Sequence, residues 1–238
     1  MNNKVKYIGL ESRVQYEVLE SAISDYLFSG FFDKERCLYH IKQFNKGENR
    51  ARKILKHINL IINRNDNILS FFIRNKESFN FTEFSIFERR IFLLCLFCNS
   101  YPIAFDIVLN CAQVFKVQSI LSKSVITSKI GSLYGSNRSM HIAIIEFLPF
   151  LIECGLISRL KIGFYKEGKT IYIKNRIVYE ILVYTFLHGS KIKYFDLIDL
   201  NTKSWFKFYS FPKEPFFEPS FLLKSLEVNP NTFSFTIK

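Results

Sequence analysis

Four polar residues lie within about one helical turn of each other near the middle of the chain: Asn137, Arg138, Ser139 and His141. They precede an apolar run, so Ser136 or Asn137 is expected to cap the N-terminus of a helix. Backbone N–H groups and the positive end of the helix dipole favour an anion at such a place, and Asn and Arg can also bond to base edges. These residues therefore predict recognition of a phosphate-bearing ligand. Ordinary capping of a helix that binds nothing is the alternative.

Two short helices are expected to position these side chains. The first covers about Ser124 to Tyr134 and directs Lys123 and Lys129 toward solvent or phosphate. A glycine-bearing turn leads to the second helix, which ends at Gly155. Pro149 removes one backbone hydrogen bond inside the second helix, which predicts a kink or a break near Ile145. The residues expected to face inward are Val125, Ile126, Ile130 and Leu133, then Ile142, Ile145, Leu148, Leu151 and Ile152.

The pattern changes from helical to alternating after residue 155. Apolar and polar residues alternate over 159–165 and again over 170–174, which predicts a β-hairpin with its turn at 166–169. Its cations are Arg159, Lys161, Lys166, Lys169 and Lys174. A helix-turn-helix followed by such a β-wing presents one helix to a DNA groove and a charged ribbon to the neighbouring phosphates. Residues 122–174 therefore predict a winged helix-turn-helix-like segment.

Composition restricts the partners that this segment can have. The chain has 238 residues, of which 48% are hydrophobic and 17% aromatic, enough for one large domain or two small ones with a buried core. The formal net charge of +12 favours a polyanionic partner, either nucleic acid or a membrane surface. The longest apolar runs, 91–97 and 142–157, are too short to span a bilayer, and the second is interrupted by Glu146 and Glu153. No secretory signal opens the chain. We therefore expect a cytoplasmic protein without a membrane partner.

Catalytic and metal-binding patterns are absent from the sequence. It contains no P-loop, no G-x-G-x-x-G, no H-E-x-x-H and no His/Asp/Glu cluster at metal-ligand spacing. Cys95 and Cys98 form a C-x-x-C, but no second pair accompanies it. The odd number of cysteines, five, favours reduced and buried thiols over a disulfide framework. We expect a non-enzymatic protein that needs no cofactor and no metal.

The N-terminal part is expected to be a helical bundle. Predicted helices cover 12–29, 34–44 and 49–64, and Ser85 to Glu88 has the spacing of a capping box that opens a central helix. That helix is apolar on all sides over 91–97, so the others must pack around it. The helix at 49–64 has a basic face that either extends a nucleic-acid footprint or is simply solvated. Its cations are Arg50, Arg52, Lys53 and Lys56, with His57 and Arg64 also expected to be exposed.

The C-terminal part has a different composition. After a short helix at 177–188, residues 191–238 are rich in aromatic side chains. This much aromatic surface must be covered, so the tail either packs back on the body or forms a partner-binding surface. Its aromatic residues include Phe195, Trp205, Phe206, Phe208, Tyr209, Phe211, Phe216, Phe217 and Phe221.

Three stretches, together with the order of the helices, resemble the BrxA family of bacterial BREX phage-defence systems. They are the basic stretch 49–54, the apolar helix running into Tyr101-Pro102-Ile103, and the helix end at 153–157. The resemblance covers roughly Leu19 to Ile157 and implies a helical bundle related to the antitermination factor NusB, together with DNA binding. The aromatic tail departs from the family pattern.

The sequence thus predicts a mainly α protein, a NusB-like helical bundle with a winged helix-turn-helix-like segment and a small β-hairpin. The predicted parts are an N-terminal bundle (1–115), the winged segment packed on it (116–188) and an aromatic-rich extension (189–238). The expected function is non-enzymatic binding of duplex DNA as an accessory protein of a BREX-like defence system, with other defence subunits as further partners. The alternatives are a protein-interaction scaffold of a defence complex and a NusB-like RNA-binding factor.

Overall fold

The computed structural model describes residues 8–77, 80–212, 221–229 and 232–238, and it is mainly helical. Several ends of the N-terminal helices are capped as the sequence predicts. Asp33 accepts a hydrogen bond from the Arg36 N–H, and Ser85 and Glu88 form a reciprocal capping box. The first helices are α1 (Tyr16–Ser29), α2 (Lys34–Phe44), α3 (Glu48–Arg64), α4 (Asp66–Arg74), α5 (Ile86–Ser100) and α6 (Pro102–Phe115), with the 3-10 turn η1 (Phe81–Glu83) before α5.

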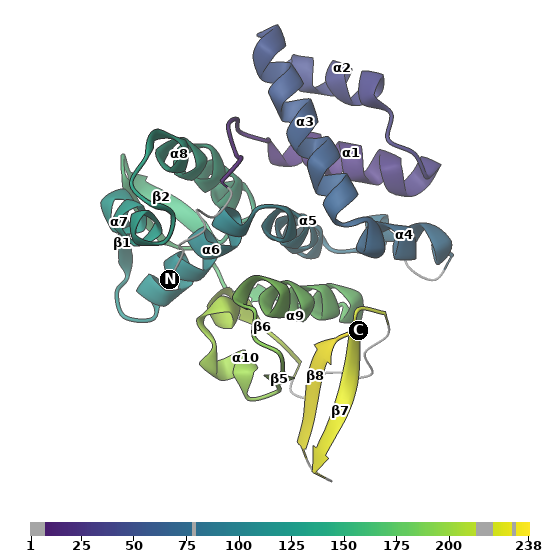
Figure 1. The fold of residues 1–238 in the computed structure, drawn as a ribbon, viewed down its shortest axis with the longest axis vertical. Coiled ribbons are helices and arrows are strands. Elements are labelled where there is room, and N and C mark those ends of the chain that lie inside the picture. The colour runs from purple at the N-terminus through teal and green to yellow at the C-terminus, as the bar shows by residue number, and fades with distance from the viewer. Residues whose placement is uncertain (1–7, 78–79, 213–220, 230–231) are drawn as a thin grey trace.

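Helix α5 lies at the centre of the molecule (Figure 1). Helices α1, α3, α6 and α9 (Arg176–Ser190) contact it, and its residues 91–98 are fully buried or nearly so. This agrees with the prediction that an all-round apolar helix must be surrounded by others. All five cysteines are free and buried, as expected of reduced thiols. The buried residues form one hydrophobic cluster with members from all three predicted parts of the chain.

A compact unit follows the central helices. Its elements after α6 are β1 (Ile120–Ser122), α7 (Lys123–Tyr134), α8 (Arg138–Glu153), β2 (Ile157–Lys161) and β3 (Phe164–Glu167). The three strands form an antiparallel sheet in the order β1-β3-β2. Figure 1 shows this unit beside α5 and away from α2 and α4. Helix α8 continues through Pro149 to Glu153, so of the two predicted alternatives the break is wrong, and the kink stays a prediction.

The β-hairpin was predicted too long and with the wrong turn. Its turn is at Ile162 and Gly163, where Gly163 has a φ of +76° that a glycine adopts without strain. The segment beyond β3 leaves the sheet: β4 (Ile171–Tyr172) pairs in parallel with β6 (Tyr209–Ser210) of the C-terminal region. The alternation over 170–174 has the period of a strand, but periodicity does not specify the partner strand.

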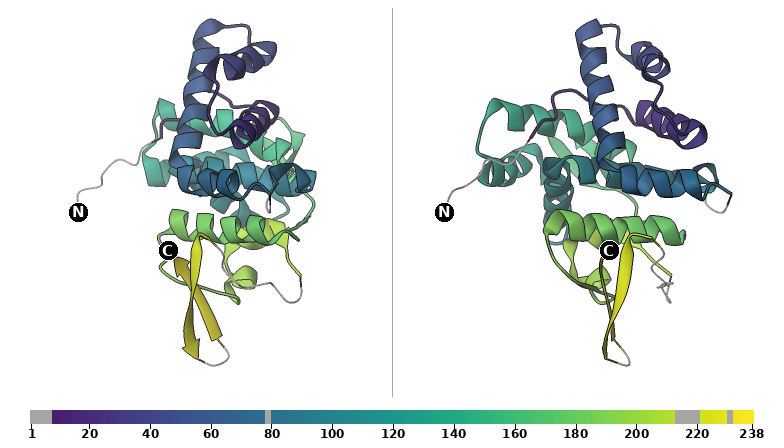
Figure 2. Two further views of the ribbon diagram at one scale, coloured as in Figure 1. Left: turned by 90° about the vertical axis from the view of Figure 1, so that its right-hand side faces the viewer. Right: turned by 45° about the vertical axis from the view of Figure 1, so that its right-hand side comes forward.

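The aromatic tail packs back on the body in its described parts. Trp205 is fully buried, stacks on Phe105 at a centroid distance of 4.7 Å and donates an Nε1–H hydrogen bond to the Leu182 carbonyl. Of the predicted aromatic set, Phe216 and Phe217 lie outside the described residues. The elements of this region are β5 (Phe195–Asp196), α10 (Asp199–Thr202), η2 (Ser204–Phe208), β6, β7 (Leu223–Asn229) and β8 (Thr232–Ile237). The β7–β8 hairpin extends from one end of the molecule (Figure 2).

His57 corrects another expectation, because it is buried instead of exposed. Its Nδ1 lies 2.6 Å from the Tyr101 hydroxyl, and its Nε2 accepts a hydrogen bond from the Glu11 N–H at 3.3 Å. Burial lowers the pKa of His57 to about 4, because the charged imidazolium would lose its hydration. Neutral His57 therefore ties α3 to the start of α6 and to the segment before α1.

Candidate nucleic-acid interface

The first turn of α8 is built as the sequence predicts. Asn137 is the N-cap, and its Oδ1 accepts the Met140 N–H at 2.9 Å. Met140 is fully buried, whereas Arg138, Ser139 and His141 are exposed. The capping role uses the Asn137 side chain, so Arg138, Ser139 and His141 are the side chains of this turn left for a ligand.

The buried face of α8 differs from the predicted one. Ile145 was expected in the core but is 49% exposed, and Leu133 at the end of α7 is 46% exposed. Helix α8 is apolar on most sides, so the periodicity of its sequence could not predict which of its faces packs against α6 and α7. The residues of α8 that are buried are Met140, Ala143, Ile144, Phe147, Leu148, Phe150 and Leu151.

The turn of the hairpin is held beside the N-terminus of α7. The Lys123 N–H donates to the Gly163 carbonyl at 2.8 Å, and Ser122 pairs with Phe164 across β1 and β3. Lys161 extends its ammonium over the Phe164 ring, 4.6 Å from the centroid. The hairpin tip, defined by residues 159–164, therefore has a set position relative to α7 and α8.

The predicted hairpin cations do not form one group. Arg159 and Lys161 lie near the tip, whereas Lys166 is at the far end of β3 and Lys169 is in the segment that leaves the sheet. Lys174 follows β4, and its N–H donates to Glu88 at the start of α5. Only Arg159 and Lys161 share the tip, because the hairpin closes earlier than the sequence suggested.

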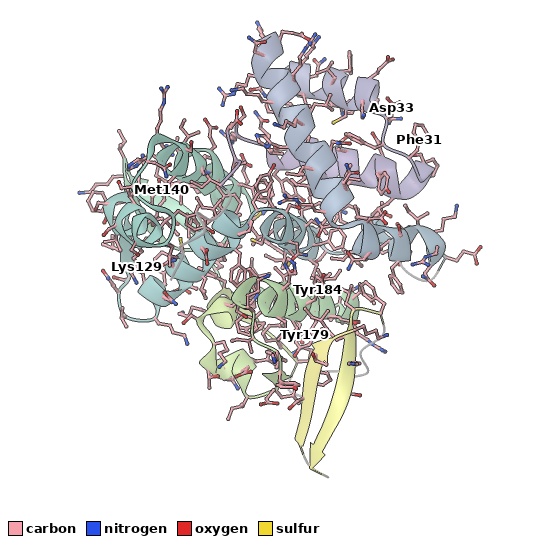
Figure 3. All side chains as sticks on the ribbon, in the orientation of Figure 1. Phe31, Asp33, Lys129, Met140, Tyr179 and Tyr184 are labelled. Carbon is pink, nitrogen blue, oxygen red and sulfur yellow. The ribbon has the colours of Figure 1, made fainter. Side chains whose placement is uncertain are left out.

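The charges around this unit favour an anion. Residues 116–174 contain nine Lys or Arg and three Glu. Each of these carboxylates is paired with a cation from outside the unit: Glu146 with Arg50 at 3.4 Å, Glu153 with Arg13, and Glu167 with Lys207 at 2.8 Å. Within the described chain, the Lys and Arg side chains of 116–174 form no ion pair. Lys129 on α7 lies on the same side of the molecule as Met140 on α8 (Figure 3).

The basic face of α3 is different, because three of its four predicted contact residues are paired with carboxylates. Arg50 contacts Glu146, and the other two pairs are Arg52 with Glu48 at 3.0 Å and Lys53 with Glu11 at 3.2 Å. Lys56 is exposed and forms no ion pair with a described residue. The structure therefore brings Arg50 close to α8, pairs Arg52 and Lys53 with the protein's own acids, and leaves Lys56 exposed without an ion pair to a described residue.

Sequence reasoning missed the apolar side chains at the hairpin tip. Ile162 is 92% exposed, with Leu160 and Phe164 beside it in sequence. A glycine at 163 between two short strands was the available signal for a tight turn at this point. The tip therefore combines cations with an exposed apolar surface.

Comparison of the chain with family models, curated proteins and solved structures finds no match. In the described part of the chain, no three His, Cys, Asp or Glu side chains are placed to hold a metal ion. No described helix has both the length and the apolar character needed to cross a bilayer.

Proposed function

We propose that this protein binds duplex DNA through the first turn of α8 and the tip of the β2–β3 hairpin. The observation that carries the proposal is the element order from α6 to β3, with the antiparallel sheet order β1-β3-β2. We interpret this order as a winged helix-turn-helix, in which the second helix of the pair would enter the major groove and the wing would contact the backbone. In this interpretation α8 is the recognition helix.

The proposed roles follow from side-chain chemistry. Arg138 offers a planar fork that bonds to guanine or to phosphate, and Ser139 and His141 extend the same turn. Arg159 and Lys161 at the tip, with Lys123 and Lys129 of α7, offer charges that attract phosphates without selecting a sequence. Burial of duplex against this unit releases counterions, so salt weakens the binding.

The resemblance of residues 19–157 to the BrxA family supports the same proposal and extends it. It adds a role as an accessory DNA-binding protein of a phage-defence assembly, and a NusB-like bundle as the body that carries the winged unit. The element order and the charge pattern support DNA binding without that resemblance.

The test is a titration of duplex DNA, single-stranded DNA and RNA against the full chain at two salt concentrations. Arg138→Ala should weaken duplex binding by about 1 to 3 kcal/mol, with an unchanged melting temperature. Arg74→Ala is the matched control, since Arg74 is an exposed arginine at the end of α4, on another part of the molecule. Parent-like duplex binding by Arg138→Ala contradicts the proposal, and a preference for RNA favours the NusB-like alternative.

A second candidate function, a docking scaffold, is supported by an exposed aromatic corner. Phe28 is 89% exposed at the end of α1, and Phe31 follows it in the connection to α2. Figure 3 shows Phe31 far from Lys129, so a protein partner here leaves the DNA surface open. Pull-down of a specific defence subunit that is lost in Phe28→Ser, with duplex binding intact, supports this function.

A further inference from the structure

A cavity lies at the base of the β2–β3 hairpin, away from its tip. Its volume is about 820 Å³, which is within the range of about 300 to 1,000 Å³ typical of small-ligand sites. Its walls come from the start of α5, the end of α8, the start of β2, and the chain from the end of β3 through β4. We call it the hairpin-base cavity. No role in the proposed duplex interface accounts for it.

Two aromatic side chains line the cavity and remain half exposed. Phe87 is 50% exposed and Tyr172 is 55% exposed. The Arg90 guanidinium carbon lies 5.7 Å from the centroid of the Phe87 ring, a cation–π distance that orients this ring. Every nucleobase has a π-face and can therefore stack on an exposed aromatic side chain. Phe87 and Tyr172 offer two such rings to a planar ligand in this cavity.

Two lysines line the same cavity. Lys166 and Lys169 are exposed, and neither forms an ion pair with a described residue. Glu167 also lines the cavity, but its carboxylate is 2.8 Å from the Lys207 ammonium, which compensates its negative charge. The remaining charge of the lining is positive, which complements an anion. Ser158 and Thr170 add hydroxyl groups that can donate to or accept from a polar ligand.

The shape of the cavity floor depends on a close backbone approach. A Cβ at Gly168 would lie 1.9 Å from the Gly155 carbonyl oxygen, so only glycine fits where this segment crosses the end of α8. The Gly168 N–H also donates to the Leu156 carbonyl at 2.8 Å. The segment that carries Lys169 is therefore anchored, and the cavity is part of the folded structure.

We propose that the hairpin-base cavity binds a nucleotide. Its base stacks on Phe87 and Tyr172, and its phosphate is held by Lys166 and Lys169. The inference goes beyond the proposed duplex interface and reassigns these two lysines from the wing to a separate site. A free mononucleotide and an unpaired nucleotide of a DNA strand share this chemistry.

The first experiment is a calorimetric titration of the full chain with adenosine monophosphate, with adenosine and inorganic phosphate as partial ligands. Adenosine monophosphate should bind saturably at one site, and each partial ligand should bind at least about tenfold more weakly, since each lacks half of the contacts. Phosphate that binds as tightly as the nucleotide overturns the stacking role. Absence of saturable nucleotide binding overturns the proposal.

Variants identify the site. Lys166→Ala combined with Lys169→Ala, and separately Tyr172→Ala, should each weaken nucleotide binding by about tenfold or more. The controls are Lys34→Ala combined with Lys46→Ala, whose lysines are exposed elsewhere, and Tyr194→Ala, because Tyr194 is also 55% exposed. Tyr172→Phe should keep the stacking and the affinity. Site variants that bind like the parent overturn the proposal.

Two further measurements separate this site from the duplex interface and identify the ligand's source. Arg138→Ala should leave nucleotide affinity unchanged. The two proposals can therefore fail separately: the protein can bind the nucleotide without binding duplex DNA, and duplex DNA without the nucleotide. A single-stranded oligonucleotide that displaces adenosine monophosphate identifies the strand as the source. Nucleotide binding without such displacement identifies the free mononucleotide.

Discussion

Acidification should destabilise this protein through His57, whose imidazole is buried and neutral. Its pKa of about 4 lies below the ordinary value of 6.5, so the unfolded chain binds the proton more tightly than the folded chain. The stability that neutral His57 contributes is present above pH 6.5 and is lost as the pH falls toward 4. A difference of this size corresponds to about 3 kcal/mol.

The measurement compares the parent with His57→Gln in urea unfolding between pH 7 and pH 4. Trp205 is the one tryptophan of the chain and is fully buried, so its fluorescence reports the loss of the folded core. Carboxylates titrate in both proteins, so the difference between the two free energies of unfolding isolates His57. This difference should shift in favour of the variant by about 3 kcal/mol as the pH falls from 7 to 4. A difference that stays constant over this range would refute the account of His57 as a buried neutral group.

Three other predictions follow from the packing and the charges. Gly168→Ala should destabilise the fold by about 1 to 3 kcal/mol in urea unfolding, because its Cβ would clash with Gly155, whereas Gly131→Ala inside α7 would meet no atom closer than 3.6 Å and should not destabilise it. The five buried thiols should resist a thiol reagent in native buffer and react only after unfolding, and rapid native labelling would contradict their burial. Neutralising Arg159 and Lys161 together should reduce the slope of log affinity against log salt by up to about two ion equivalents on every duplex. An unchanged slope would remove the hairpin tip from the DNA surface.

Local signals in the sequence were sufficient for the ends and the types of most helices. Asp33, the pair Ser85 and Glu88, and Asn137 each cap the helix that their residue types predict, because capping depends on groups within one turn of each other. The all-round apolar character of α5 likewise predicted its central position. The chemistry of the α8 first turn could be proposed from the sequence for the same reason: its residues are neighbours along the chain.

The tertiary structure alone decided which surfaces remain available. The carboxylates that pair with Arg50 and Lys53 lie far away in sequence and could not be assigned from the pattern, whereas Glu48 lies one helical turn before Arg52 on the same helix. The partner of β4 is a strand near residue 209, so the segment that carries Lys169 leaves the hairpin instead of extending it. Contacts between distant segments depend on the packing of the whole chain, so they cannot be predicted from the periodicity within one segment.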